Sequence, residues 1–154
     1  MTQSIADKPL QTGHVGLNVT NLEKSLPFYI RVFGFEILAE GKDDSQRWAF
    51  LARDGRLMLT LWQQSQESFS GGAAGLHHLS FQVDSIEDVK AAEAVLRELG
   101  ADFAHDGVVS HGEGAGSGGI FFADPDGIRL EIYAPSGAES APAPTGAAPT
   151  CGFF

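Results

Sequence analysis

The 154-residue sequence contains little of what secreted, membrane-spanning or nucleic-acid-binding chains require. A single cysteine, Cys151, excludes a disulfide within the chain and fits a reducing compartment. No run approaches the ~18 consecutive apolar residues of a membrane helix, and residues 1–11 are too polar for a secretory signal. The 10 basic residues are outnumbered by 20 acidic ones, a net charge of −10, whereas binding to a phosphate backbone needs clustered Lys and Arg. We therefore expect a cytoplasmic protein with no nucleic-acid and no membrane partner.

The most informative feature that is present is an internal repeat. His14–Glu23 is echoed by His78–Glu87, and each position of the second stretch lies 64 residues after its counterpart. Both stretches have His, an amide side chain four residues later and then Val, followed by a helix-capping residue, an aliphatic residue and Glu. A repeat of this length indicates one supersecondary unit that was built twice.

Each copy predicts the order β-α-β-β-β. In the first copy we expect a strand, a helix capped by Asn21 and ended by Gly34, and three further strands, at residues 13–19, 22–33, 35–40, 47–52 and 56–63. In the second copy the helix is capped by Ser85 and ended by Gly100, and the five elements lie at residues 77–83, 86–99, 101–105, 119–123 and 128–134. The sequence thus predicts an α+β fold of two βαβββ modules.

The remaining segments have the composition of connections. The predicted organisation is a flexible lead-in, a first module, a linker, a second module and a low-complexity tail, at residues 1–11, 12–64, 65–75, 76–135 and 136–154. The tail is rich in Ala, Pro, Gly and Ser, which predicts a mobile terminus. Its apolar residues 151–154 leave open that it docks near a cleft or on a partner chain.

Two histidines and a glutamate are predicted to lie on strand faces that point away from the core. Because alternate side chains of a strand point to opposite faces, His14 and His78 lie opposite the aliphatic residues that pack against the helices. Glu131 alternates with Leu130 and Ile132 and points away from the core in the same way. A carboxylate in this setting is costly to bury unless it is paired or binds a metal. Two imidazoles and one carboxylate suit one divalent ion: Fe(II), Mn, Zn, Ni or Co.

The repeat also predicts what occupies a fourth position. Glu131 is the fourth residue after Gly127 of its turn, and Leu59 is the fourth residue after Gly55 of the equivalent turn. Leu59 is therefore expected to stand where a fourth ligand could be, as part of an apolar wall. Positions on the metal would then stay open for water, oxygen or substrate.

Further residues are predicted to line a substrate pocket or to act in catalysis. The expected pocket residues are Asn18, Trp48, Phe50, Leu59, Ser80 and Gln82. Tyr133 is in phase with Glu131 and is a candidate proton donor, while His111 lies on the glycine-rich loop 105–119, a candidate lid, and could act as an acid or base. The alternative is core packing for Trp48 and Phe50, an aromatic wall for Tyr133 and a solvated side chain for His111.

Four motifs resemble the vicinal oxygen chelate superfamily of glyoxalase I, fosfomycin-resistance enzymes, extradiol dioxygenases, methylmalonyl-CoA epimerase and bleomycin-resistance proteins. The motifs are His14-Val-Gly-Leu-Asn-Val, Phe28-Tyr-Ile-Arg-Val-Phe-Gly-Phe, His78-Leu-Ser-Phe-Gln-Val-Asp and Asp124-Pro-Asp-Gly-Ile-Arg-Leu-Glu. The resemblance covers residues 13–135 and implies a concave, partly closed sheet cleft with His14, His78 and Glu131 as metal ligands.

The resemblance implies a metal-dependent enzyme acting on vicinal oxygens of a small substrate. Three ligands and an apolar fourth position slightly favour a dioxygenase, ring-cleaving or related. The alternatives are a glyoxalase-like lyase or isomerase, and a non-catalytic protein that sequesters an apolar drug or metabolite. We also expect a homodimer, since in this superfamily modules pair within one chain or across two. Pairing across two chains would combine His14 of one chain with His78 and Glu131 of the other.

Overall fold

The computed structural model describes residues 4–154, which form two βαβββ modules, as predicted. The first module contains one helix and four strands, β1 (Val15–Asn18), α1 (Leu22–Phe33), β2 (Glu36–Gly41), β3 (Trp48–Arg53) and β4 (Arg56–Trp62). The second contains β5 (Leu79–Gln82), α2 (Ile86–Glu98), β6 (Val109–Ser110), β7 (Gly118–Ala123) and β8 (Arg129–Ala134). Two short 3₁₀ helices, η1 (Ile5–Asp7) and η2 (Thr150–Gly152), lie outside the modules.

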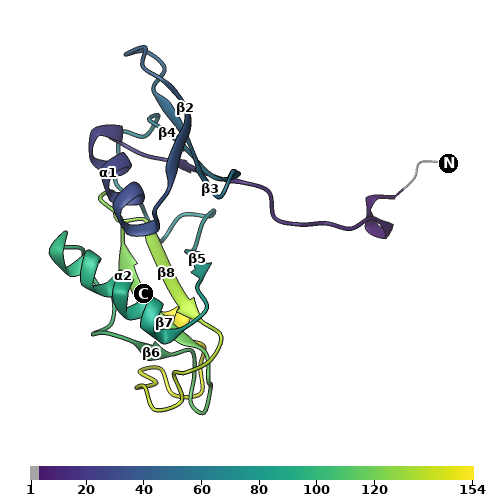
Figure 1. Cartoon of the computed structure of the whole chain (residues 1–154), viewed down its shortest axis with the longest axis vertical. Coiled ribbons are helices and arrows are strands. Elements are labelled where there is room, and N and C mark those ends of the chain that lie inside the picture. Colours follow the sequence, from purple (N-terminus) through teal and green to yellow (C-terminus); the bar gives the residue numbers. More distant parts are fainter. Residues whose placement is uncertain (1–3) are drawn as a thin grey trace.

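Each module forms one mixed four-stranded sheet with the same topology. The strand orders are β1-β4-β3-β2 and β5-β8-β7-β6, and in each sheet the first strand runs parallel to the last strand of its module. Figure 1 shows the two sheets one above the other, with α1 and α2 on the same side of them. One continuous hydrophobic core joins both modules, because the aliphatic faces of both sheets pack against these helices.

Local sequence signals set the ends of the helices and the tight turn. The Asn21 side chain accepts a hydrogen bond from the Glu23 N–H at 2.9 Å at the start of α1, and Gly34 ends the helix with φ of +67°. At the start of α2 the Ser85 hydroxyl accepts from the Asp88 N–H at 3.2 Å. Asp54 and Gly55, with φ of +52° and +75°, turn β3 into β4, as their sequence predicts.

One predicted strand is wrong. Residues 101–105 form no strand and contribute only an isolated bridge between Phe103 and Phe122. The edge strand is instead Val109–Ser110, inside the segment predicted to be a lid. Val109 and Ser110 pair with Gly119 and Gly118 of β7, and the outer side of this edge strand is covered from far along the chain, because the Ser110 N–H donates to the Pro142 carbonyl at 2.7 Å.

The 136–154 segment packs on the second module, which is the docked alternative left open by its sequence. Thr150 is fully buried, and its N–H and hydroxyl donate to the carbonyls of His111 and Ser110 at 2.9 and 2.7 Å. The Glu113 N–H donates to the Gly146 carbonyl at 2.9 Å. These bonds tie the segment to loop 105–119, so neither is a free loop. In contrast, the described part of the lead-in extends away from the body (Figure 1).

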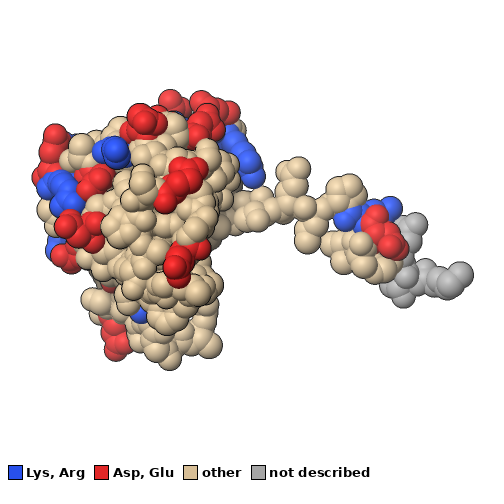
Figure 2. Space-filling model, turned by 90° about the horizontal axis from the view of Figure 1, so that it is seen from below, with Lys and Arg blue, Asp and Glu red and all other residues tan. Residues whose placement is uncertain are grey.

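The surface agrees with the acidic composition. On the face shown in Figure 2, Asp and Glu side chains are scattered over the molecule, and Lys and Arg side chains do not gather into a patch. Within residues 4–154, neither long helix has the length and apolar character needed to cross a membrane.

The turn Asp124-Pro-Asp-Gly fastens the two modules together. The buried Tyr29 hydroxyl of α1 donates to the Asp124 carboxylate at 2.9 Å, and Thr20 donates to Asp126 from its N–H at 3.0 Å and from its hydroxyl. Burial, reinforced by the Asp124 charge, raises the pKa of Tyr29 well above its usual value, so the phenol remains a donor. The same Asp124 carboxylate accepts from the Asp126 and Ile128 N–H groups, both at 2.8 Å, which shapes the turn before β8.

We predict that Tyr29→Phe lowers the free energy of unfolding by about 1–3 kcal/mol, because it leaves a buried carboxylate oxygen without its donor. Tyr133→Phe is the matched control. Its hydroxyl bond to Gln82 lies at the surface, and its loss should cost about 1 kcal/mol or less. Urea denaturation of both variants measures this difference, and equal losses would mean that the Tyr29 bond does not fasten the modules.

Candidate metal and substrate site

Glu131 lies at the centre of the second sheet. Its neighbours Leu130 and Ile132 enter the core, so Glu131 points to the opposite face, between Ser80 on β5 and Phe121 on β7. Only 3% of Glu131 is exposed. A carboxylate this deeply buried needs a hydrogen-bond donor or a cation beside it.

Two histidines approach the Glu131 carboxylate from different parts of the chain. His78 directly precedes β5, and its Nε2 lies 3.6 Å from the Glu131 Oε2. The His111 Nε2 is in direct contact with the Glu131 Oε1. The His111 Nδ1 is in turn 2.8 Å from the Ser117 hydroxyl, which orients the ring. Burial lowers the pKa of His78 from its usual value, although Glu131 opposes this shift. The neutral imidazole, which is the form that binds metals, is therefore favoured.

The other residues predicted for this face are also there. The Tyr133 hydroxyl donates to the Gln82 side-chain oxygen at 2.9 Å, and the Tyr133 ring centroid is 5.1 Å from that of His111. Ser80 pairs directly with Glu131 in the register. The structure thus brings together six of the predicted residues, namely His78, Ser80, Gln82, His111, Glu131 and Tyr133.

Four predicted residues lie on the equivalent face of the first sheet. Trp48 and Phe50 alternate with core residues of β3 and have ring centroids 4.8 Å apart, while Asn18 accepts from the Gln64 N–H at 3.0 Å. His14 is exposed, directly before β1. Within residues 4–154, no group of three or more His, Cys, Asp or Glu side chains is arranged to hold a metal ion. A single chain therefore does not bring His14 to the pair of His78 and Glu131.

Sequence reasoning missed Trp62, which completes the aromatic wall of the first sheet. Its ring centroid is 6.2 Å from that of Trp48 and 5.9 Å from that of Phe50. Trp62 pairs with Trp48 across the sheet. The alternation along β4 could have placed Trp62 on this face, since Trp62 is in phase with Thr60 and out of phase with the buried Leu61.

The assignment of Leu59 to the cleft is wrong. Leu59 is 0% exposed and belongs to the hydrophobic core. The register pairs Gly16 with Thr60 and Ser80 with Glu131, so Thr60 is the counterpart of Glu131. Counting from the turn fails because the register of β3 and β4 shifts between Leu51 and Ala52, which leaves one extra residue in β4.

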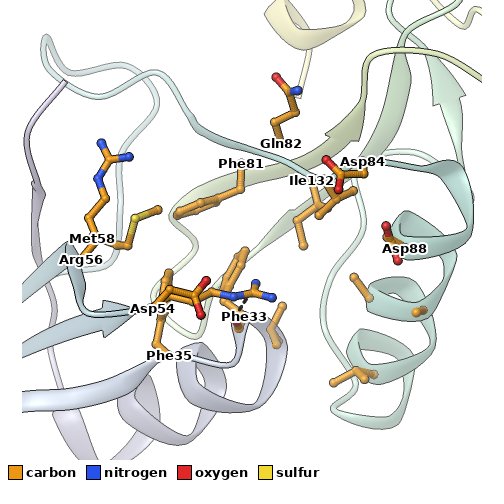
Figure 3. A pocket seen from close by; sticks show the side chains of 16 residues that line it. Phe33, Phe35, Asp54, Arg56, Met58, Phe81, Gln82, Asp84, Asp88 and Ile132 are labelled. Carbon is orange, nitrogen blue, oxygen red and sulfur yellow. Dashed lines mark hydrogen bonds between the residues drawn. The ribbon is translucent and has the colours of Figure 1, made fainter. Parts of the chain in front are cut away.

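A separate cavity of about 790 Å³ lies between the end of α1, the β3–β4 turn and α2. Figure 3 shows Phe33, Phe35 and Phe81 among the side chains that line it, together with Asp54, Arg56, Asp84 and Asp88. Its lining includes Gln82 but no histidine and no glutamate, so it is not the site that the metal-ligand pattern predicts.

The sequence and the fold both identify the family. The Glyoxalase/Bleomycin resistance protein/Dioxygenase superfamily matches residues 11–132, and the chain belongs to this superfamily. It is 30% identical over 125 residues to the catechol-2,3-dioxygenase of Bacillus subtilis (strain 168), covering 79% of this chain but only 40% of that protein. It is 34% identical over 124 residues to the trivalent organoarsenical cleaving enzyme of Bacillus sp. (strain MD1), covering 80% of this chain and 73% of that protein.

Solved structures show the same fold. A glyoxylase/bleomycin resistance protein/dioxygenase domain from Frankia sp. EAN1pec superposes with a TM-score of 0.72 at 27% identity, covering 83% of this chain and 99% of that one. The fosfomycin resistance protein FosX from Listeria monocytogenes, complexed with Mn(II) and sulfate, superposes with a TM-score of 0.61 at 22% identity, covering 84% and 95%. Proteins with this fold thus include one that binds a divalent metal.

The corrected register makes a testable prediction about β4. Leu59→Ala should lower the free energy of unfolding by about 2–5 kcal/mol, because it opens a cavity in the core. Thr60→Val, which keeps the shape and removes only the acceptor of the Trp62 Nε1–H bond at 3.0 Å, should cost about 1 kcal/mol. Urea denaturation compares the two variants. A larger loss of unfolding free energy for Thr60→Val than for Leu59→Ala would mean that Thr60 lies in the core and Leu59 faces the cleft.

Proposed function

We propose that two copies of this chain build a divalent-metal centre from His14 of one copy and the pair of His78 and Glu131 of the other. The observation that carries this proposal is the buried Glu131 carboxylate, which has His78 beside it on one sheet while His14 occupies the equivalent place on the other. Two imidazoles and one carboxylate are a set that suits Fe(II) and similar ions. The half-buried aromatic wall of the first sheet, Trp48, Phe50 and Trp62, would face the second sheet of the partner.

The function best supported by this arrangement is an oxygenase that cleaves or otherwise oxidises an aromatic compound with two neighbouring oxygens. A metal held by three protein ligands would polarise and orient those oxygens. The counterpart of Glu131 in the first module is Thr60, whose hydroxyl already accepts a bond from Trp62, so a fourth protein ligand is not expected from that strand. The aromatic wall suits a planar ring, and the identity to the catechol dioxygenase points the same way.

His111 and Tyr133 are the residues proposed to handle protons. The His111 Nδ1 is held by the Ser117 hydroxyl, and its Nε2 donates to the Glu131 carboxylate, so a metal bound by that carboxylate would make the Nε2 proton available to a substrate oxygen. The Tyr133 hydroxyl, bonded to Gln82, lies on the same face and can donate to a substrate oxygen. His111→Gln should therefore slow turnover more than it weakens substrate binding.

Cleavage of a carbon–arsenic bond is the second candidate. It is favoured by the identity to the organoarsenical cleaving enzyme, which extends over 73% of that protein. Oxygen uptake by the Fe(II)-loaded protein with catechol, compared with arsenite release from a trivalent phenylarsenical, separates the two candidates. Binding of either compound without turnover would support a sequestering protein instead.

A subunit-mixing experiment tests the shared centre. Loss of a partner that merely orients a ligand costs about 10–100-fold in metal affinity, so His14→Ala, His78→Ala or Glu131→Ala should each weaken binding at least about tenfold. Co-expressed His14→Ala and Glu131→Ala chains should regain one intact site per mixed dimer, because the intact His14 and the intact Glu131 then meet. Metal analysis of the purified mixed dimer measures this recovery.

Three results of the subunit-mixing experiment would contradict the shared metal centre. Binding that stays as weak in the mixed dimer as in the two single variants would place all ligands on one chain. Full metal occupancy in His14→Ala alone would remove His14 from the site. Sedimentation of each preparation controls for dimer formation, and a metal-replete monomer would contradict the shared centre.

A further inference from the structure

The side chain of Phe154 lies against the residues of the proposed metal site. Its ring centroid is 5.4 Å from that of His78, at an interplanar angle of 36°, and 5.4 Å from that of Phe121, edge to face. The Arg129 guanidinium carbon lies 5.6 Å from the same ring centroid. Phe121 is the cross-strand neighbour of Glu131, so the ring of Phe154 covers the face of the sheet on which Glu131 lies.

His78, Phe121 and Arg129, which we term the ring shelf, have the chemistry of an aromatic-binding surface. A tilted imidazole, the edge of a phenyl ring and a guanidinium each interact favourably with the face of an aromatic ring. A purely aliphatic group could make the same apolar contacts with this shelf, but it has no π system to interact with the Arg129 guanidinium. The shelf is therefore selective for a planar π system.

The segment that carries Phe154 is held at Thr150 and is loosely packed from Gly152 onward. Thr150 is fully buried and bonded to Ser110 and His111. Gly152 is exposed, and a side chain there would meet no atom within 4 Å. The only bond found beyond Gly152 that reaches the body of the module within residues 4–154 is the 3.1 Å contact of the Phe153 carbonyl with the His105 Nε2. Residues 153–154 can therefore leave the shelf while Thr150 stays in place.

We propose that the ring shelf is a binding subsite for the aromatic ring of a small molecule, and that Phe154 fills this subsite until the small molecule displaces it. The proposal takes the location of the substrate face from the proposed function but requires no metal and no turnover. The apparent affinity for an aromatic ligand is then the intrinsic affinity reduced by the fraction of chains with an open shelf. Phe154 thus raises the ligand concentration that half-saturates the subsite.

The test uses the metal-free full chain and 4-nitrophenol, whose binding is followed by equilibrium dialysis. Phe154→Ala should bind 4-nitrophenol about three- to tenfold more tightly than the unmodified chain, because the competing ring is gone. Phe153→Ala is the matched control, since Phe153 is 54% exposed and adjacent in sequence, and it should leave the affinity unchanged. Adding Arg129→Gln to Phe154→Ala should reverse the gain. Cyclohexanol should not compete with 4-nitrophenol.

Amide hydrogen exchange supplies a second readout. Saturating 4-nitrophenol should speed exchange at the Phe153 amide, which donates to the Thr150 carbonyl at 3.0 Å, while the Thr150 amide remains protected. Equal affinity of Phe154→Ala and Phe153→Ala, competition by cyclohexanol, or unchanged exchange at the Phe153 amide would each overturn the proposal. Because these measurements use no metal, their failure is distinct from failure of the proposed oxygenase, which is measured by metal content and oxygen uptake.

Discussion

The burial of one carboxylate, Glu131, is the constraint on which the second module depends. Strand pleating sends Leu130 and Ile132 into the core and leaves Glu131 on the other face, where it is nonetheless almost fully covered. A buried carboxylate without partners would destabilise the fold. The contacts of His78 and His111 supply those partners. Because His111 belongs to loop 105–119, its contact also connects Glu131 to this loop and to the 136–154 segment that is bonded to it.

The two modules share a topology and have diverged in chemistry. The register makes Thr60 the counterpart of Glu131 and Gly16 the counterpart of Ser80, so the first sheet offers aromatic surface where the second offers a carboxylate. A symmetric pair of carboxylates is thereby avoided, and each module supplies a different part of a site. Within residues 4–154 one chain keeps His14 apart from the pair of His78 and Glu131, so the proposed metal centre requires two copies.

The sequence was a good guide wherever local pattern and period decide the outcome, and a poor guide wherever distant contacts decide it. The repeat predicted both modules, and alternation placed His78, Glu131 and Tyr133 on one face, because these features follow from strand geometry. Leu59 was misplaced because a register shift in β4 is set by pairing with β3 and has no signature in the turn. The edge strand Val109–Ser110 lacks an alternating pattern of its own and is covered by Pro142, and the docking of Phe154 depends on His78, so neither could be found from a local pattern.

The proposed metal centre takes its ligands from two chains. Anomalous diffraction from crystals grown with Mn(II) locates the metal directly. We expect a single anomalous peak at each His78–Glu131 pair, with the His14 imidazole of a second copy as the third protein ligand. A peak coordinated by His78, His111 and Glu131 of one chain, with His14 remote from every metal, would contradict it.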